Sequence, residues 1–267
     1  MDLELKGKRA LVTGGSRGIG KAIARVLAAE GADVALLARK PEALAATAAE
    51  LSAESGRTVV GVQADTTSDE QVHAAVAQAA RQLGGPIDIL VNAAAEPAGF
   101  AGPPPLAEIG AGFFHAEMDT KVMGYIRCAR EVAPGMKAQG WGRIVNISGL
   151  AARSTGNAVG SMRNVAVAAF TKNIADELGP HGINVTVVHP GLTRTERTAP
   201  LMAARAAAQG VTAAQIEAQM AAGNTIGHIV DAHEVAYLVA FLCSPKSRAV
   251  NGDAIAAGGG VRGTIHY

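Results

Sequence analysis

Three glycines near the N-terminus have the spacing of a phosphate-binding loop. Gly14, Gly18 and Gly20 lie between the apolar run RALVTG and the alanine-rich run KAIARVLAAEGA, so they join an expected strand to an expected helix. The first glycine permits a tight turn, the second lets the backbone approach a pyrophosphate, and the third lets the helix pack closely on the strand. The helix N-terminus then offers N–H groups and a positive dipole end to the phosphates. The alternative is a tight turn without a ligand.

Cations follow the second apolar run, where a cofactor with a free ribose 2′-hydroxyl usually meets an acid. This run ends at Ala38, and Arg39 and Lys40 come next, while Arg17 adds a positive charge in the glycine loop. Arg and Lys side chains at a place where no acidic residue binds the ribose 2′-hydroxyl favour a ribose 2′-phosphate. The sequence therefore predicts NADP, with NAD as the other possibility. The alternative is that Arg39 and Lys40 are solvated surface charges.

These residues need a parallel sheet to position them. Continuous apolar runs alternate with alanine-rich helical stretches from RALVTG to DAIAAGGG, as in strands that are buried on both faces and joined by helical crossovers. We therefore expect an α/β fold, a Rossmann-type doubly wound parallel sheet of about seven strands with helices on both faces. No linker or repeat divides the chain, so we expect a single dinucleotide-binding domain over residues 1–267.

Two segments interrupt this alternation. Residues 96–110 form a Pro/Gly-rich stretch after the fourth expected strand, and residues 193–230 separate the sixth strand from the last helix. The second segment is too long for a plain connection, so we expect it to form one or two small helices and to act as a substrate lid. Both segments follow carboxyl ends of strands, where open parallel sheets bind ligands.

The composition argues against several classes of function. A net charge of +1 provides no field for nucleic acid, and no apolar run is long enough to span a bilayer. The N-terminus has neither a signal core nor a transit pattern. Cys128 and Cys243 fit no metal spacing and no disulfide framework. We expect a cytoplasmic protein without a metal site.

These motifs together resemble the short-chain dehydrogenase/reductase family over nearly the whole chain. They are TGGSRGIG at 13–20, AD at 64–65, VNAAA at 91–95, GRIVNIS at 142–148, HPGLTRT at 189–195 and VNGDAIAAGGG near the end. The resemblance implies an NAD(P)-dependent oxidoreductase that acts on a small alcohol or carbonyl substrate. It also implies a homo-oligomer, a tetramer or a dimer.

The resemblance further implies which residues hold the cofactor. The adenine would lie at Asp65 and Thr66, the adenosine ribose at Asn92, Ala93 and Ala94, and the nicotinamide amide at Pro190, Gly191 and Thr195. The other expected cofactor-binding residues, from the glycine loop and the second strand, are Gly14, Ser16, Arg17, Gly18, Ile19, Gly20 and Arg39. Alanine at 93 and 95 departs from the family's N-N-A-G pattern.

The family's catalytic residues are not all present. The family uses a Ser, a Tyr as general acid/base, a Lys four residues after that Tyr, and usually an Asn on the preceding long helix. In GNAVGSMRNVAVAAFTKN the Tyr position falls on Gly160 and the Lys position on Asn164. The Ser position falls on Ser148 or Gly149, and Lys121 stands at the Asn position.

Lys121 is the residue best placed to replace the missing pair. From the neighbouring helix its side chain would enter the gap at Asn164, where it would hydrogen-bond the ribose hydroxyls and partial desolvation would lower its pKa. It would then donate or relay a proton, while Ser148 orients the substrate oxygen. We therefore take Ser148, Lys121 and Asn164 as candidate catalytic residues. The alternative is that Lys121 extends to solvent.

Four other side chains have chemistry to offer. We expect His189 to be a buried structural histidine and Tyr125 to lie on the same helix face as Lys121. The family resemblance implies that Tyr125, as an aromatic residue of the long helix, packs at a subunit interface. His115 lies on the same long helix. Arg163 either binds a substrate carboxylate or covers the helix surface.

Three functions remain open from the sequence. The first is an NADP-dependent oxidoreductase with an altered proton donor. The second is a lyase or isomerase on the same scaffold, and the third is a nucleotide-binding sensor or inactive partner subunit. Loss of general acid/base catalysis slows hydride transfer without making it impossible, so family membership favours the first.

Overall fold

The computed structural model describes residues 1–95 and 102–263. Seven parallel strands form one sheet in the order β3-β2-β1-β4-β5-β6-β9. The strands are β1 Arg9–Thr13, β2 Asp33–Ala38, β3 Val59–Gln63, β4 Ile89–Asn92, β5 Gly142–Ile147, β6 Ile183–Pro190 and β9 Ala254–Ala257. The predicted doubly wound parallel sheet is therefore confirmed.

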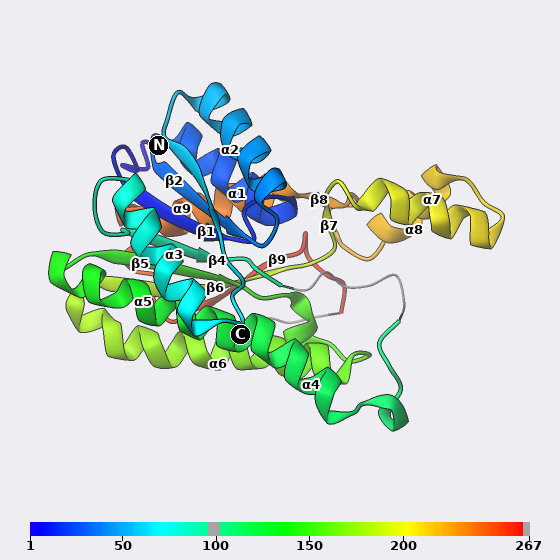
Figure 1. Cartoon of the computed structure of the whole chain (residues 1–267). Helices are drawn as coiled ribbons and strands as arrows, with labels where there is room; N and C mark the ends of the chain where they lie inside the picture. The colour runs from blue at the N-terminus through cyan, green and yellow to red at the C-terminus, as the bar shows by residue number, and fades with distance from the viewer. Residues whose placement is uncertain (96–101, 264–267) are drawn as a thin grey trace.

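Helices cover both faces of this sheet, as Figure 1 shows. One face carries α1 Gly18–Ala29, α2 Pro41–Ser55 and α9 Ala232–Cys243, and the other carries α3 Asp69–Gln82, α5 Gly124–Gln139 and α6 Ala158–Leu178. Two apolar clusters, one on each face, fill the space between strands and helices. The strands are apolar without alternation because both of their faces are covered.

The strand order reverses beside β1, which pairs with β2 on one side and β4 on the other. Thr13 at the end of β1 is in register with Asn92 at the end of β4. The loops that leave these two strands therefore open at one edge of the sheet. This is the crevice where doubly wound sheets bind their ligands.

The long helix before β5 is interrupted by a π-helical turn. It consists of α4 Ala111–Met118, the π turn η2 Asp119–Met123 and α5. The turn contains Lys121, which is buried. A π turn inserts a residue and changes the phase of the helix faces, and such turns occur frequently at functional sites.

Residues 193–230 form a helical hairpin, as expected of this insertion. It contains β7 Thr193–Arg194, α7 Thr198–Gln209, α8 Ala213–Ala221 and the first residue of β8 Val230–Asp231, and β7 pairs with β8. A small apolar cluster of its own holds the two helices together: Met202, Ala206, Ile216, Ala221 and Ile229. Figure 1 shows the hairpin extending away from the sheet, beyond the labels of β7 and β8.

The Pro/Gly-rich segment is described only in part, because residues 96–101 lie outside the described residues. A short 3-10 helix, Leu106–Glu108, follows them. Within the described ranges, no helix combines the length and the apolar character needed to cross a membrane.

Candidate active site

The glycine loop has the geometry that its sequence predicts. Gly14 and Gly18 have φ values of +66° and +57°, in the left-handed region where a Cβ is disfavoured. A Cβ on Gly20 would lie 2.4 Å from the carbonyl oxygen of Gly14, so only glycine allows α1 to approach β1 this closely. The turn and packing roles given to these glycines are thus confirmed, with Gly18 required by its conformation.

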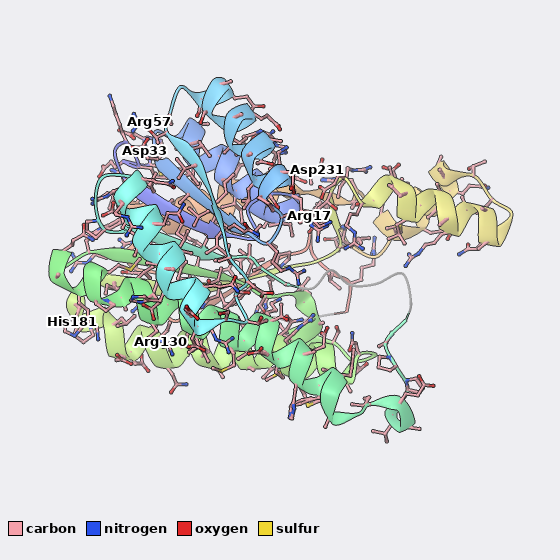
Figure 2. All side chains as sticks on the ribbon, in the orientation of Figure 1. Arg17, Asp33, Arg57, Arg130, His181 and Asp231 are labelled. Atoms are coloured by element: carbon pink, nitrogen blue, oxygen red, sulfur yellow. The ribbon has the colours of Figure 1, made fainter. Side chains whose placement is uncertain are left out.

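The other loop residues take different positions. The Ser16 carbonyl accepts a hydrogen bond from Thr47 Oγ1 at 3.2 Å, and Ile19 packs against the apolar cluster under α1. Arg17 is exposed at the start of α1, and Figure 2 labels it on the side from which the hairpin extends. Ser16 and Ile19 therefore shape the loop, while Arg17 presents its charge to solvent.

The ends of β1 and β4 are tied together by Thr13. Its Oγ1 accepts hydrogen bonds from the backbone N–H groups of Ala93 at 3.0 Å and Ala94 at 3.1 Å. Asn92 is fully buried, and its Nδ2 donates to Asn146 Oδ1 at 2.9 Å. The Asn92 side chain thus crosslinks two strands, and Ala93, which is partly buried, packs against the apolar cluster under α1.

A shallow cavity of about 270 Å³ lies at the ends of β2 and β3, where the adenosine is expected. Arg39, Gln63, Ala64, Asp65 and Gln71 line it. The exposed Arg39 brings a guanidinium to this cavity, and Asp65 brings a carboxylate. Thr66 lies behind it, buried, and its carbonyl accepts from Arg127 Nη1 at 3.1 Å.

The residues expected at the nicotinamide follow β6. Pro190 is the last residue of that strand, and the Gly191 N–H donates to the Ala257 carbonyl at 3.2 Å. A Cβ on Gly191 would lie 2.8 Å from Gly258 Cα, which requires glycine at this position. Thr195 follows β7 near the start of the hairpin, where its N–H donates to Thr198 Oγ1 at 2.9 Å.

Lys121, Ser148 and Asn164 form one buried cluster beyond the end of β5. Lys121 Nζ donates to the Ser148 carbonyl at 2.9 Å and to Asn164 Oδ1 at 3.0 Å. Ser148 Oγ donates to the Asn164 carbonyl at 3.0 Å and lies 3.2 Å from Asn164 Oδ1. Lys121 is 4% exposed, so the interpretation of a side chain that extends to solvent is wrong.

Burial lowers the pKa of Lys121 from its ordinary value to about 7, because the charged amine is taken out of water. The positive charge of Arg163 lowers this pKa further, and the negative charge of Glu117 opposes it. At neutral pH the Lys121 amine is therefore present in both its protonated and its neutral form. A group with this property can transfer a proton in either direction.

The space beside Gly160 is filled by a residue that the sequence reasoning missed. Asn157 caps α6, and its Oδ1 accepts the Gly160 N–H at 2.8 Å. A Cβ on Gly160 would lie 2.7 Å from the Asn157 side chain. The signal was available, because asparagine before an apolar helix is a typical N-cap.

The remaining candidates are placed as follows. Tyr125 is 1% exposed and its hydroxyl donates to the Ile147 carbonyl at 2.8 Å, so the expectation of a subunit-interface residue is wrong. Arg163 forms an ion pair with Glu117, which joins α6 to α4. His189 is buried, as expected, and His115 is exposed on α4.

Over residues 1–95 and 102–263, no group of three or more His, Cys, Asp or Glu side chains could hold a metal ion.

A family model for the short chain dehydrogenases matches residues 8–206. This chain belongs to the short-chain dehydrogenase family. The predicted family is therefore confirmed, and with it the predicted NAD(P)-dependent oxidoreductase function.

Relatives in this family are similar over almost their full length. The chain is 34% identical to the short-chain reductase protein NovJ of Streptomyces niveus over 252 residues, which cover 94% of this chain and 92% of NovJ. The L-sorbose reductase of Gluconobacter frateurii, solved with NADPH and L-sorbose, superposes with a TM-score of 0.92 at 29% identity and covers 99% of this chain and 100% of its own. A short chain dehydrogenase of Burkholderia cenocepacia, solved with NADP, gives 0.80 at 35% identity, with 96% and 98% covered.

Proposed function

We propose that this short-chain dehydrogenase is an NADPH-dependent carbonyl reductase in which Lys121 replaces the family's tyrosine–lysine pair. The observation that carries this proposal is the contact of Lys121 Nζ with both Ser148 and Asn164. Asn164 stands at the family's lysine position, so the amine of Lys121 reaches that position from the neighbouring helix. An ammonium group is thereby supplied where the usual one is absent.

The cofactor is NADP, held at the glycine loop and the cavity at the ends of β2 and β3. Arg39 lines that cavity and Arg17 stands at the start of α1, and guanidinium groups at these two places suit a ribose 2′-phosphate. The similar proteins solved with NADPH or NADP support this choice.

The proton is the part of the reaction that this chain's residues supply. When bound, NADPH supplies the hydride to the substrate carbonyl carbon, and the carbonyl oxygen then needs a proton. Two of the three ammonium N–H bonds of Lys121 have acceptors among the described residues, which leaves the third for the substrate oxygen. Lys121 gives up a proton, becomes the neutral amine that its burial favours, and regains a proton from water.

Ser148 orients the substrate oxygen in this scheme. Its hydroxyl donates to the Asn164 carbonyl, and rotation about one bond turns the hydroxyl toward a ligand. Asn164 then keeps Lys121 in place through its Oδ1. Each of the three residues has one role: proton donor, oxygen orientation and positioning of the amine.

A second candidate is an NADP-binding protein without catalysis. It is favoured by the burial of Ser148 and Lys121, whose polar atoms already have partners within the chain. Oxidation of NADPH by the protein with a panel of aldehydes and ketones separates the two candidates. Transfer of deuterium from labelled NADPH to a product supports the reductase, whereas NADPH binding without any product supports the second candidate.

Residues 193–230 form a substrate lid in this proposal, because they follow a strand end beside the site. We also propose that residues 1–267 form a single domain. Exposed apolar side chains, Met123 on the long helix and Met162 and Val165 on α6, support a homotetramer or homodimer. We place the protein in the cytoplasm, and light scattering at micromolar concentration tests its assembly.

A further inference from the structure

A carboxylate contacts the glycine loop where a cofactor phosphate is expected. Glu196 Oε2 accepts a hydrogen bond from the backbone N–H of Gly18 at 3.2 Å. Gly18 is the first residue of α1, and its N–H is one of the groups that a helix N-terminus offers to an anion. A carboxylate and a phosphate oxygen accept the same kind of hydrogen bond from this group.

Helix α1 has no cap of its own that would compete for this position. Its N-cap residue Arg17 makes no side-chain cap hydrogen bond, and the first turn contains no acidic residue. Asn157 in α6 and Thr212 in α8, by contrast, cap their own helices. The negative charge at the start of α1 is therefore brought from a distant part of the chain, by Glu196.

Glu196 lies at the base of the hairpin, between β7 and α7. Two residues before it, Arg194 forms ion pairs with Glu217 of α8 and with Asp231 of β8. Figure 2 shows Arg17 and Asp231 on the same side of the molecule, at the neck of the hairpin. A displacement of Glu196 from the glycine loop would thus act directly on the segment that holds α7 and α8.

We propose that Glu196 is an internal competitor of the cofactor's pyrophosphate and ties the base of the hairpin to the glycine loop until NADP binds. Two anions repel each other at one helix N-terminus, so the bound pyrophosphate displaces the Glu196 carboxylate. The displacement releases the hairpin base, and cofactor binding is thereby coupled to the segment that borders the substrate. This inference rests on the proposed binding of NADP at the glycine loop.

The cofactor can bind only to molecules in which Glu196 has left the glycine loop. The apparent affinity for NADPH is therefore the affinity of these molecules multiplied by their fraction of the total. If Glu196 occupies the loop in about nine molecules of ten, its removal tightens NADPH binding about tenfold. We expect Glu196→Ala and Glu196→Gln to lower the NADPH dissociation constant by about three- to tenfold. The exposed position of Glu196 makes both variants compatible with folding.

The test is calorimetry of the full-length protein with two probes, NADPH and 2′-AMP, which has no phosphate at the 5′ position. The matched control is Glu217→Gln, which removes the same charge from the same hairpin while Arg194 keeps Asp231 as its partner. We expect tighter NADPH binding in the Glu196 variants alone and unchanged 2′-AMP binding in all of them. An equal gain in the control or with 2′-AMP would overturn the proposal, since a general charge effect would explain it.

Hydrogen exchange of α7, residues 198–209, gives a second measurement. We expect NADPH to raise exchange there in the unmodified protein, and Glu196→Ala to show the raised exchange without NADPH. Unchanged NADPH affinity in both Glu196 variants would also overturn the proposal, although the binding of NADP itself would stand. If neither the unmodified protein nor any variant binds NADPH, the proposed function itself is wrong.

Discussion

The two halves of this molecule differ in how many of the family's motif residues they contain. The nucleotide half, from β1 to β4, keeps the pattern, and Gly14, Gly18 and Gly20 have the conformations and close contacts that it requires. In the catalytic half, from the long helix to α6, the alignment predicted from the sequence puts Ser148 or Gly149 at the Ser position of the pattern, and Gly160 and Asn164 at its Tyr and Lys positions. An amine still reaches the site, because Lys121 arrives from the π turn of the neighbouring helix.

The difference shows how each half is encoded. The nucleotide half works mainly through backbone N–H groups and close approach, which fix residue types within one short segment. The catalytic half works through side chains, and a side chain from another element can supply the same group at the same place. Its chemistry can therefore be rebuilt while the scaffold remains.

The substitution with the largest expected effect, Lys121→Met, disrupts the catalytic half and leaves the nucleotide half intact. Lys121→Met keeps the bulk of the side chain and removes the amine, so we expect turnover to fall by about 10²–10⁴-fold. The NADPH dissociation constant should change much less, because the proposal gives the third N–H of Lys121 to the substrate oxygen and not to a cofactor ribose. Steady-state kinetics and calorimetry measure the two quantities.

Lys137→Met is the matched control for that variant. Lys137 lies on α5, the continuation of the same long helix, and pairs with the exposed Glu177. It should retain full activity. If Lys121→Met is as active as this control, Lys121 has no part in the reaction.

A second substitution breaks the nucleotide half and spares the catalytic half. Arg39→Asp puts a carboxylate where a guanidinium lines the expected 2′-phosphate cavity. Charge-assisted hydrogen bonds contribute about 1.5–3 kcal/mol, so NADPH should bind about 10–100-fold more weakly while NADH is spared. Calorimetry with both cofactors checks the outcome, and equal affinities in the unmodified protein would contradict it.

The ionisation of Lys121 provides a finer test of the catalytic half. Reduction needs the protonated amine, so the rate should fall as the pH rises through the Lys121 pKa of about 7. Arg163→Met removes a nearby positive charge and raises this pKa, which shifts the fall to higher pH. Glu117→Gln removes a negative charge and shifts it to lower pH.

Opposite shifts distinguish this role from a structural one. Both substitutions break the same ion pair between α4 and α6, so a loss of structure alone would change the two profiles in the same direction. We expect rate differences of about three- to tenfold between the two variants at pH values above both of their Lys121 pKa values, equivalent to a pKa difference of about half to one unit. Profiles of kcat against pH, measured for both variants, decide between the two roles.

The sequence predicted the fold and the nucleotide half because both depend on local patterns. Apolar runs set the strands, and the glycines set the loop. It also brought Lys121, Ser148 and Asn164 together, through the alignment of Asn164 with the family's lysine. The structure places these three side chains in contact.

The errors came from features without a local signal. Tyr125 does share a buried face with Lys121, as residue counting predicted, but that face packs against the end of β5, where the Tyr125 hydroxyl donates to the Ile147 carbonyl. The subunit-interface expectation rested on the family resemblance and had no local signal in the sequence. Glu196 contacts Gly18 only because the base of the hairpin folds back onto the loop. Contacts between such distant segments depend on tertiary packing and have no periodic signature.

The smallest expected effect concerns Gly160, which the sequence alignment predicts at the tyrosine position, and the two alanine substitutions Gly160→Ala and Gly112→Ala should differ in their effect on stability. An alanine in place of a helical glycine normally stabilises a protein by about 0.5–1 kcal/mol. We expect this gain for Gly112→Ala on α4, because a Cβ there has no neighbour within 4 Å. At Gly160 the new Cβ would lie 2.7 Å from the Asn157 side chain, which must shift and so weakens its cap hydrogen bond to the Gly160 N–H, and a lost N-cap costs about 1 kcal/mol.

Gly160→Ala should therefore be no more stable than the unmodified protein, and less stable than Gly112→Ala by about 1 kcal/mol. Urea unfolding of the two variants measures the difference. Asn157→Ala removes the cap beforehand, so the addition of Gly160→Ala to it should regain the ordinary stabilisation of a helical alanine. A gain for Gly160→Ala equal to that of Gly112→Ala would mean that Asn157 does not exclude a side chain here. The absence of the tyrosine would then have no steric basis in the cap of α6.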